Sequence, residues 1–191
     1  MHKHRTLILC AAMAVAPLAW SADNIAGLAR TCYSCHGTDG VSAGKSMPSI
    51  AGLPKDYLKT VMMEWKSGER SSPNMTRLIS GYTDEEIAGL ADYFSKMKWT
   101  PVPQSASPAM LKLGKEVASD KCESCHGATG SEGDEDTPKL NGQWAKYMEL
   151  ELDKYRDDGF KMPHKKMRKV ARKLSEEEVA AVAAYFGAQS K

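Results

Sequence analysis

Two short stretches of the chain place two cysteines and a histidine at the same spacing. The two sets are Cys32, Cys35 and His36, and Cys122, Cys125 and His126, a constant 90 residues apart. On a helix, positions i, i+3 and i+4 share a face, so each set converges on one object. Two thiols at this spacing can add to the two vinyl groups of a haem while the adjacent imidazole reaches the iron. The spacing therefore predicts two covalently attached haem c groups.

Three other kinds of cysteine chemistry fit this pattern less well. A structural zinc site needs four ligands, and each set would have to find a fourth elsewhere. A thioredoxin-type thiol pair belongs in a βαβ setting, which the hydrophobic pattern does not predict. A plain disulfide within each cysteine pair would leave His36 and His126 unexplained.

The sequence around the two motifs also repeats. Residues 53–69 align with residues 143–159 at the same offset of 90, and residues 81–94 align with residues 173–186 at an offset of 92. Two residues are therefore inserted in the second half. Halves this similar predict two domains of one fold. The expected divisions are a signal peptide at 1–21, a first domain at 22–100, a linker at 101–108 and a second domain at 109–191.

The first 21 residues have the pattern of a secretory signal peptide. Lys3 and Arg5 give a positive start, and the apolar stretch that follows is short for a membrane span. Cleavage after Ser21 would place the mature chain in the periplasm with no membrane-spanning segment; a retained membrane anchor is the alternative. Cleavage removes two basic side chains and no acid from the 26 basic and 24 acidic ones, so the mature chain is formally neutral. A neutral chain is not expected to bind nucleic acid.

The hydrophobic pattern predicts helices in both halves and no strands, so the expected fold class is all-α. Thr83 with Glu86, and Ser175 with Glu178, form capping boxes ahead of apolar faces at helical spacing. These faces consist of Ile87, Leu90, Ala91 and Phe94 in the first half and of Val179, Val182, Ala183 and Phe186 in the second. Short helices in domains of this size make a small core, so we expect a bound group to fill the middle of each.

A haem iron bound by histidine needs a second axial ligand on its other side. Aligning the halves selects Met75 and Met167, each eight residues before a helix cap and each in a loop after the middle helix. The insertion makes Met162 the runner-up in the second half, with His164 as a further alternative. A soft thioether favours Fe(II) and raises the reduction potential relative to two histidines. Iron with six ligands has no open site for a substrate, which favours electron transfer.

One segment of the second half is strongly basic. Residues 161–173, around Met167, contain seven Lys or Arg and no acid. The pattern predicts a docking surface for an acidic partner, because opposite charges steer two proteins together. The alternative is a solvated helix face that the acidic residues 131–137 balance.

Nearly all of the sequence after residue 21 resembles the dihaem cytochromes of the cytochrome c4 type, on the strength of both motifs, the methionine-to-cap spacing and the linker. The resemblance implies two tandem class I cytochrome c domains related by a pseudo-twofold axis. Class I domains place their distal methionine after the middle helix, as Met75 and Met167 lie. The resemblance also implies that the carbonyls of Pro48 and Pro138 accept hydrogen bonds from the axial histidines and so orient them. A simple turn proline is the alternative at both positions.

Five segments are similar to the cytochrome subunit of flavocytochrome c sulfide dehydrogenase: "PSIAG", "WKSGERSSPNM", "GYTDEEIAGLADYF", "GQWAKYMELELDKYRDD" and "KKMRKVARKL". In that family a separate flavoprotein subunit, which carries FAD, oxidises sulfide. The cytochrome subunit passes the electrons to a periplasmic or membrane-bound acceptor. The resemblance therefore implies an electron-transfer subunit that is not an enzyme by itself.

Two alternatives to that function remain. Free cytochromes c4, which carry electrons to a terminal oxidase or from thiosulfate dehydrogenase, share much of the pattern. A dihaem enzyme, such as a peroxidase or a thiosulfate-oxidising cytochrome, would need an open distal site or an unusual ligand such as cysteine. All four cysteines beyond residue 21 already belong to the two motifs.

Overall fold

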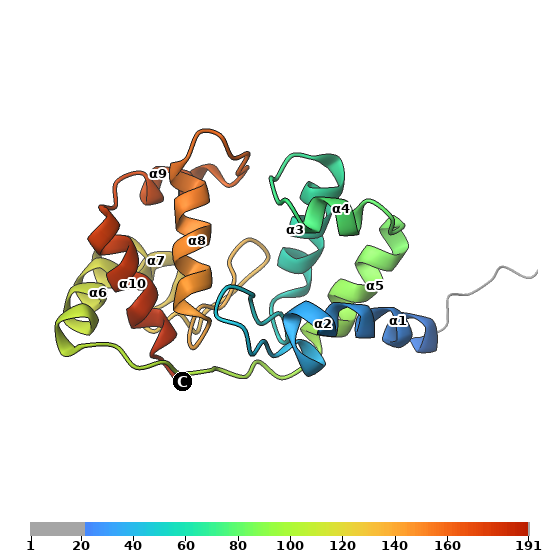
Figure 1. Cartoon of the computed structure of the whole chain (residues 1–191), viewed down its shortest axis with the longest axis horizontal. Helices are drawn as coiled ribbons and strands as arrows, with labels where there is room; N and C mark the ends of the chain where they lie inside the picture. Colours follow the sequence, from blue (N-terminus) through green and yellow to red (C-terminus); the bar gives the residue numbers. More distant parts are fainter. Residues whose placement is uncertain (1–21, 191) are drawn as a thin grey trace, which may run out of the picture.

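Two helical halves lie side by side, joined by an extended linker that runs along one edge of both (Figure 1). The structure is a computed structural model that describes residues 22–190. The predicted signal peptide, residues 1–21, lies outside them. The described residues contain no strand, which confirms the all-α class. No helix among them has the length and apolar composition needed to cross a bilayer.

The halves contain the same main elements in the same order. The first half contains α1 (Ala22–Ala29), η1 (Arg30–Cys32), α2 (Tyr33–His36), η2 (Thr38–Gly40), α3 (Lys55–Ser67), α4 (Met75–Ile79) and α5 (Asp84–Ser95). The second half contains α6 (Pro108–Lys121), α7 (Glu123–His126), α8 (Ala145–Arg156), α9 (Lys165–Ala171) and α10 (Glu176–Gly187). Helix α6 begins at Pro108, the last residue of the predicted linker, where Ser107 Oγ accepts from Met110 N at 3.3 Å.

Local sequence signals explain where the last helix of each half begins. Both predicted capping boxes are present: Glu86 N donates to Thr83 Oγ1 at 3.1 Å, and Glu178 N donates to Ser175 Oγ at 3.1 Å. Each box satisfies amide groups that the first turn of a helix leaves without a partner. The two predicted apolar faces are buried, as the cores of the two halves require.

The first and last helices of each half pack together at a glycine, but the glycine is on opposite helices. In the second half it is Gly114 of α6, where a Cβ atom would meet the carbonyl oxygen of Ala181 at 2.1 Å. In the first half it is Gly89 of α5, the counterpart of Ala181. A Cβ atom there would meet the end of the Ile25 side chain at 2.6 Å.

Gln104 fastens the linker to the second half. Its Nε2 atom donates to Val102 O at 2.8 Å, Gln143 O at 3.0 Å and Gly187 O at 3.3 Å. Its Oε1 atom accepts from Ala145 N at 2.9 Å. The linker therefore follows the second half as a fixed part of its surface.

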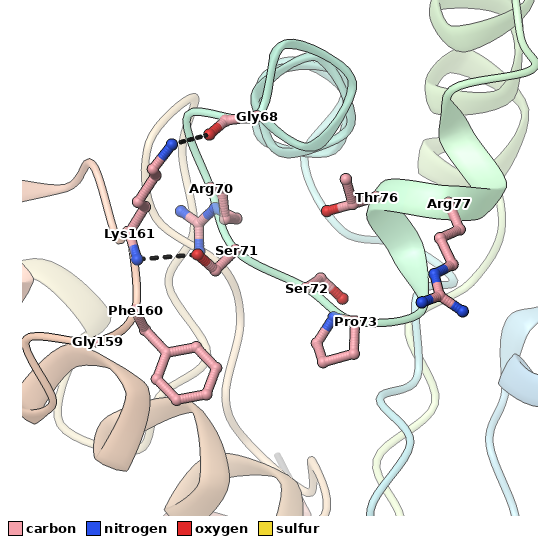
Figure 2. Close-up of a pocket in the computed structure, with 10 residues that line it drawn as sticks. All are labelled: Gly68, Arg70, Ser71, Ser72, Pro73, Thr76, Arg77, Gly159, Phe160 and Lys161. Carbon is pink, nitrogen blue, oxygen red and sulfur yellow. Dashed lines mark hydrogen bonds between the residues drawn. The ribbon is translucent and has the colours of Figure 1, made fainter.

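The halves meet through equivalent segments. Ser71 N donates to Lys161 O at 2.8 Å and Lys161 N donates to Ser71 Oγ at 2.9 Å, and the two residues are 90 apart in sequence. Beside them Arg70, only 7% exposed, bonds Glu64 at 2.7 Å and lies 5.9 Å from the centre of the Tyr155 ring. An open groove of about 380 Å³ lies at this junction, lined by both halves (Figure 2).

Candidate haem sites

The four motif cysteines lie in the short helical turns that follow the first helix of each half. Cys32 ends η1 and Cys35 lies in α2, while Cys122 caps α7 and Cys125 lies within it. All four are free thiols, and one of each pair is exposed while the other is half-buried. Burial raises the pKa of the Cys32 thiol, and raises that of Cys122 to about 11. Cys32 and Cys122 are thus protonated thiols at neutral pH, and their exposed neighbours Cys35 and Cys125 leave each pair accessible on one side.

Each motif histidine is oriented by a proline carbonyl twelve residues further along the chain. His36 Nδ1 lies 2.9 Å from Pro48 O, and His126 Nδ1 lies 3.1 Å from Pro138 O. A carbonyl accepts only, so Nδ1 carries the proton and donates. Burial lowers the pKa of both imidazoles, which keeps them neutral. A neutral ring with its proton on Nδ1 leaves the Nε2 lone pair for a metal.

Glycines with positive φ shape the loop between each histidine and its proline. Gly37 and Gly127 follow the histidines at φ 79° and 71°, and a Cβ atom on Gly37 would meet Val41 O at 1.9 Å. Only glycine adopts this conformation without strain. Gly40 and its counterpart Gly130 then accept backbone hydrogen bonds from the chain just beyond each proline. The tight loop therefore brings the proline carbonyl back to the imidazole.

The two methionines selected from the sequence lie in short helices and not in the loops expected for them. Met75 begins α4, where its amide donates to Ser72 Oγ at 3.1 Å, and Met167 lies in α9, where its amide donates to His164 Nδ1 at 3.3 Å. These side-chain acceptors each start a helix of only one or two turns. A helix this short does not produce a recognisable hydrophobic periodicity in the sequence. Both methionine side chains are half-buried.

The runner-up Met162 is more deeply placed than Met167. It is 3% exposed and packs with Tyr155 and Ala171, and Met167 lies at the edge of the same cluster. His164, between them in sequence, caps α9 and further lowers the pKa of His126 by its charge, a smaller effect than burial. The second half thus offers three sulfur or nitrogen donors on one short stretch of chain.

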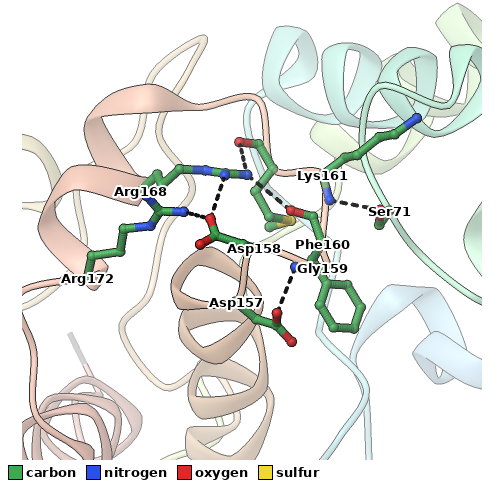
Figure 3. A network of polar contacts seen from close by, with 9 residues as sticks. Ser71, Asp157, Asp158, Gly159, Phe160, Lys161, Arg168 and Arg172 are labelled. Carbon is green, nitrogen blue, oxygen red and sulfur yellow. Dashed lines mark hydrogen bonds and ion pairs between the residues drawn. The ribbon is translucent and has the colours of Figure 1, made fainter.

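An ion-pair network holds this stretch (Figure 3). Asp158 contacts both Arg168 and Arg172. Arg168 also donates to Phe160 O at 3.1 Å and to Met162 O at 3.2 Å. The arginines of the basic segment are therefore turned toward their own domain. Its lysines at positions 161, 165, 166, 169 and 173 are exposed.

The residues present fit a haem in each half. Two buried polar atoms, Trp65 Nε1 and Asn141 Oδ1, have no hydrogen-bond partner among the described residues. A buried N–H without an acceptor carries a cost in free energy, and a carboxylate on the edge of a bound haem could accept from Trp65 Nε1. Within residues 22–190 no three His, Cys, Asp or Glu side chains lie together as ligands of a simple metal ion.

Sequence reasoning missed three polar side chains around these sites. Trp65 lies on the apolar side of α3, and nothing in the pattern reveals its unpaired N–H. Asn141 and Gln143 lie in the segment before α8 and are 4% and 3% exposed. A signal for Gln143 is present in the repeat, because its counterpart in the first half is the aliphatic Leu53. A polar residue that replaces an apolar one at a buried position indicates a specific contact.

Comparison with known proteins gives a consistent set of relatives. The family model described as Cytochrome c matches residues 111–188. Cytochrome c4 from Azotobacter vinelandii is 31% identical over 183 residues, which covers 84% of this chain and 85% of the relative. The cytochrome subunit of sulfide dehydrogenase from Chlorobaculum tepidum is 42% identical over 84 residues, which covers 44% of this chain and 74% of the relative.

The fold agrees with these relatives. The crystal structure of reduced recombinant cytochrome c4 from Pseudomonas stutzeri superposes with a TM-score of 0.78 at 28% identity, covering 90% of this chain and all of that one. The predicted arrangement of two tandem class I cytochrome c domains is therefore confirmed. So is the predicted cofactor content, one haem c for each of the two domains.

Proposed function

The chain belongs to the cytochrome c4 family, and from this premise we propose that it is the electron-transfer subunit of a sulfide-oxidising flavocytochrome c in the periplasm. Membership makes it a dihaem electron carrier. The proposal adds the ligand residues, the partner and the compartment. The observation that carries it is the 42% identity with the cytochrome subunit of sulfide dehydrogenase from Chlorobaculum tepidum.

We assign one haem to residues 22–100 and the other to residues 109–191, with residues 101–108 as the linker. In each half two cysteines attach the haem, a histidine and a methionine bind its iron, and a proline carbonyl orients the histidine. These residues are Cys32, Cys35, His36, Met75 and Pro48 in the first half, and Cys122, Cys125, His126, Met167 and Pro138 in the second, with Met162 as the runner-up to Met167. The neutral imidazoles with free Nε2 atoms support this assignment.

The residues around each site favour the carrying of electrons over chemistry on a substrate. When bound, each haem supplies a one-electron Fe(III)/Fe(II) couple. The thioether sulfurs of the assigned methionines stabilise Fe(II), and ligands on both faces leave no place for a reactant. The chain would then have no catalytic activity of its own. Sulfide oxidation would belong to a flavoprotein subunit that carries FAD.

Charge supports a partner at the second haem. Exposed lysines surround α9, which carries Met167, whereas the exposed part of the matching α4 carries a single cation, Arg77. A cluster of positive charge at one haem accelerates the encounter with an acidic partner. The second half is thus the side on which we expect the flavoprotein or the periplasmic or membrane-bound electron acceptor to dock.

Co-purification tests the proposal. The native protein is isolated from periplasmic extract, and its haem spectrum is followed after sulfide is added. We expect a flavin-bearing chain to accompany it, and sulfide to reduce both haems. The separated cytochrome alone should stay oxidised over the same interval. Reduction by sulfide without the partner, or the absence of any flavoprotein from a preparation that retains both haems, would contradict the assignment.

A free cytochrome c4 carrier is the second candidate. The match to the Azotobacter vinelandii cytochrome c4 extends over 84% of the chain, whereas the match to the sulfide dehydrogenase subunit covers 44%. A free carrier would purify without a flavoprotein. It would accept electrons from a donor such as thiosulfate dehydrogenase and pass them to a terminal oxidase. The co-purification experiment separates the two candidates.

A further inference from the structure

We propose that Gln143, a residue of the second half, is a positioning residue for the proximal histidine of the first haem site. The inference rests on the proposed assignment of His36 as an axial ligand. It states that the second domain reaches across the junction and fixes the backbone on which the His36 hydrogen bond depends. The potential of the first haem would then depend on how the two domains are docked.

Both ends of the Gln143 amide bond one residue of the other half. Ser49 N donates to Gln143 Oε1 at 2.9 Å, and Gln143 Nε2 donates to Ser49 O at 2.9 Å. The two residues are 94 apart in sequence, and they are 3% and 2% exposed. The Gln143 side chain pairs with both the N–H and the C=O of Ser49, as a neighbouring strand pairs with a residue in a sheet. Two such bonds fix the orientation of the Ser49 backbone as well as its distance from Gln143.

Ser49 directly follows Pro48, so the brace lies next to the carbonyl that His36 uses. Pro48 O and Ser49 N belong to the same peptide group, which is planar and rotates as one unit. Gln143 Oε1 accepts from the N–H end of this peptide, and His36 Nδ1 donates to its C=O end at 2.9 Å. Holding the N–H end therefore sets the direction in which the carbonyl points toward the imidazole.

The base of Gln143 is itself fixed. Its backbone N–H donates to Leu140 O at 3.0 Å, and its carbonyl accepts from Gln104 Nε2 at 3.0 Å. The next residue, Trp144, donates from Nε1 to Ser42 O at 2.9 Å, a second bond across the junction. The brace is therefore part of a rigid contact and not a single side chain free to swing away.

The second haem site has no such brace. The peptide equivalent to Pro48–Ser49 is Pro138–Lys139, and within the described residues neither backbone group of Lys139 has a hydrogen bond. The counterpart of Gln143 in the first half is Leu53, which lies in the core of its own half. The arrangement at these two peptides is thus one-sided: Gln143 of the second domain holds Ser49, whereas the cross-junction bond from Trp99 Nε1 of the first domain goes to Asn141 O at 3.1 Å and, among the described residues, not to Lys139.

The chemistry of the axial ligand gives the brace a consequence. A histidine that donates strongly from Nδ1 is a more basic ligand through Nε2, and a more basic ligand favours Fe(III). If Gln143 is lost, the Pro48 carbonyl can tilt and the hydrogen bond weakens. The first haem should then become easier to reduce while the second keeps its properties.

The variant Gln143→Leu, which copies the residue of the first half, tests this in the full dihaem protein. Redox titration should show one of the two haems with a reduced-to-oxidised ratio raised about threefold to tenfold at a fixed potential, where tenfold is about 59 mV for one electron. In reduced protein labelled with ¹⁵N-histidine, the Nδ1–H proton of His36 should exchange with water faster, and that of His126 should not.

Two further variants keep the test decisive. Trp144→Phe removes the neighbouring bond across the junction but leaves the Ser49 contacts, so both potentials should stay as in the wild type. Gln143→Glu keeps the acceptor for Ser49 N and is used if the leucine variant does not fold. Exchange of the His36 Nδ1–H proton should then be faster than in the wild type, but by less than complete loss of the Gln143 amide would give.

Unchanged potentials and exchange rates in a Gln143→Leu protein that holds both haems would overturn the inference. An equal shift in Trp144→Phe would do the same, because it would indicate general loosening of the junction. Failure of the proposed function is recognised separately, from the wild-type protein's haem ligands and flavoprotein partner.

Discussion

In both halves a proline carbonyl lies beside the motif histidine, at 2.9 Å in the first and 3.1 Å in the second. The glycine turns that form the loop are repeated, and so are the capping boxes of α5 and α10. The distal segments are not. One methionine lies in an α4 segment with little charge, whereas α9 follows a longer loop and has two methionines, a histidine and a row of lysines nearby. The features that the two halves share are those that would hold a haem. The features that differ are those that each haem would face on its distal side.

The helix packing differs in the same way. A glycine allows the first and last helices of each half to approach, but on α6 it faces backbone and on α5 it faces a flexible side chain. Two domains of one fold thus meet the same geometric need with different residues. Substitutions should have the largest effect at the cysteine motifs, followed by the distal methionines, the glycine contacts between helices and the lysines of α9.

Removing the cysteines of one half should remove one haem only. In Cys32→Ser/Cys35→Ser, and separately in Cys122→Ser/Cys125→Ser, we expect the haem content per chain to fall from two to one, because each pair lies in its own domain. Haemochrome absorbance and intact mass measure this. Loss of both haems from either double variant would show that the sites are not independent.

Spectra and stability measurements should distinguish the methionines that bind iron from the one that only fills the core. Met75→Ala and Met167→Ala should each abolish thioether ligation at one haem and lower its potential by on the order of 100 mV, within the range of about 0.8 V that axial ligands span. Met162→Ala should retain the ligand but lower the free energy of unfolding by about 2–5 kcal/mol, because it empties a buried site.

Spectroelectrochemistry and denaturant unfolding of the holoprotein give the two readouts. If Met162→Ala loses the thioether signature and Met167→Ala keeps it, the runner-up is the ligand and the alignment of the two halves fails at the insertion.

The glycine contacts should respond unequally to a methyl group. Gly114→Ala forces a Cβ atom against the Ala181 carbonyl, and should lower the free energy of unfolding by about 2–3 kcal/mol. Gly89→Ala meets only the movable end of Ile25 and gains about 1 kcal/mol of helix propensity, so its net effect should stay below about 1 kcal/mol. Thermal unfolding of both variants is the measurement, and equal losses would refute the difference in packing.

Surface charge should affect the rate of association with the flavoprotein in the second half only, at the lysines of α9. Reversing Lys165 and Lys169 to Glu should slow association with the flavoprotein by up to about tenfold at low ionic strength, since steering depends on local charge. Reversing Lys45 and Lys59 of the first half changes net charge equally and should have little effect. Stopped-flow reduction at two salt concentrations compares them, and equal slowing by both pairs would exclude a docking surface at α9.

Signals confined to a few neighbouring residues could be predicted from the sequence. The cysteine–histidine spacing, the capping boxes and the buried faces of α5 and α10 depend on local geometry, and the repeat doubles the information by aligning one half with the other. The tandem arrangement and its two haems follow from the same repeat, whereas the class I fold of each domain is implied by the resemblance to cytochromes c4. The ligand residues themselves stay a prediction, supported by the position of the proline carbonyls.

Contacts between distant segments could not be predicted. The basic segment contains no acid, yet Asp158, just before it, neutralises part of its charge through Arg168 and Arg172. The Gln143–Ser49 bonds join residues 94 apart and depend on how the domains dock. The short helices α4 and α9 start at single polar acceptors, Ser72 and His164, which periodicity does not detect.

The haem content and ligation of the wild-type protein test the central claim most directly. Intact mass and haemochrome absorbance should give two covalently bound haems per chain. The oxidised spectrum should show low-spin iron with thioether ligation at both. A chain with one haem or none, or with a high-spin iron open to cyanide or carbon monoxide, would contradict the account of two closed electron-transfer sites.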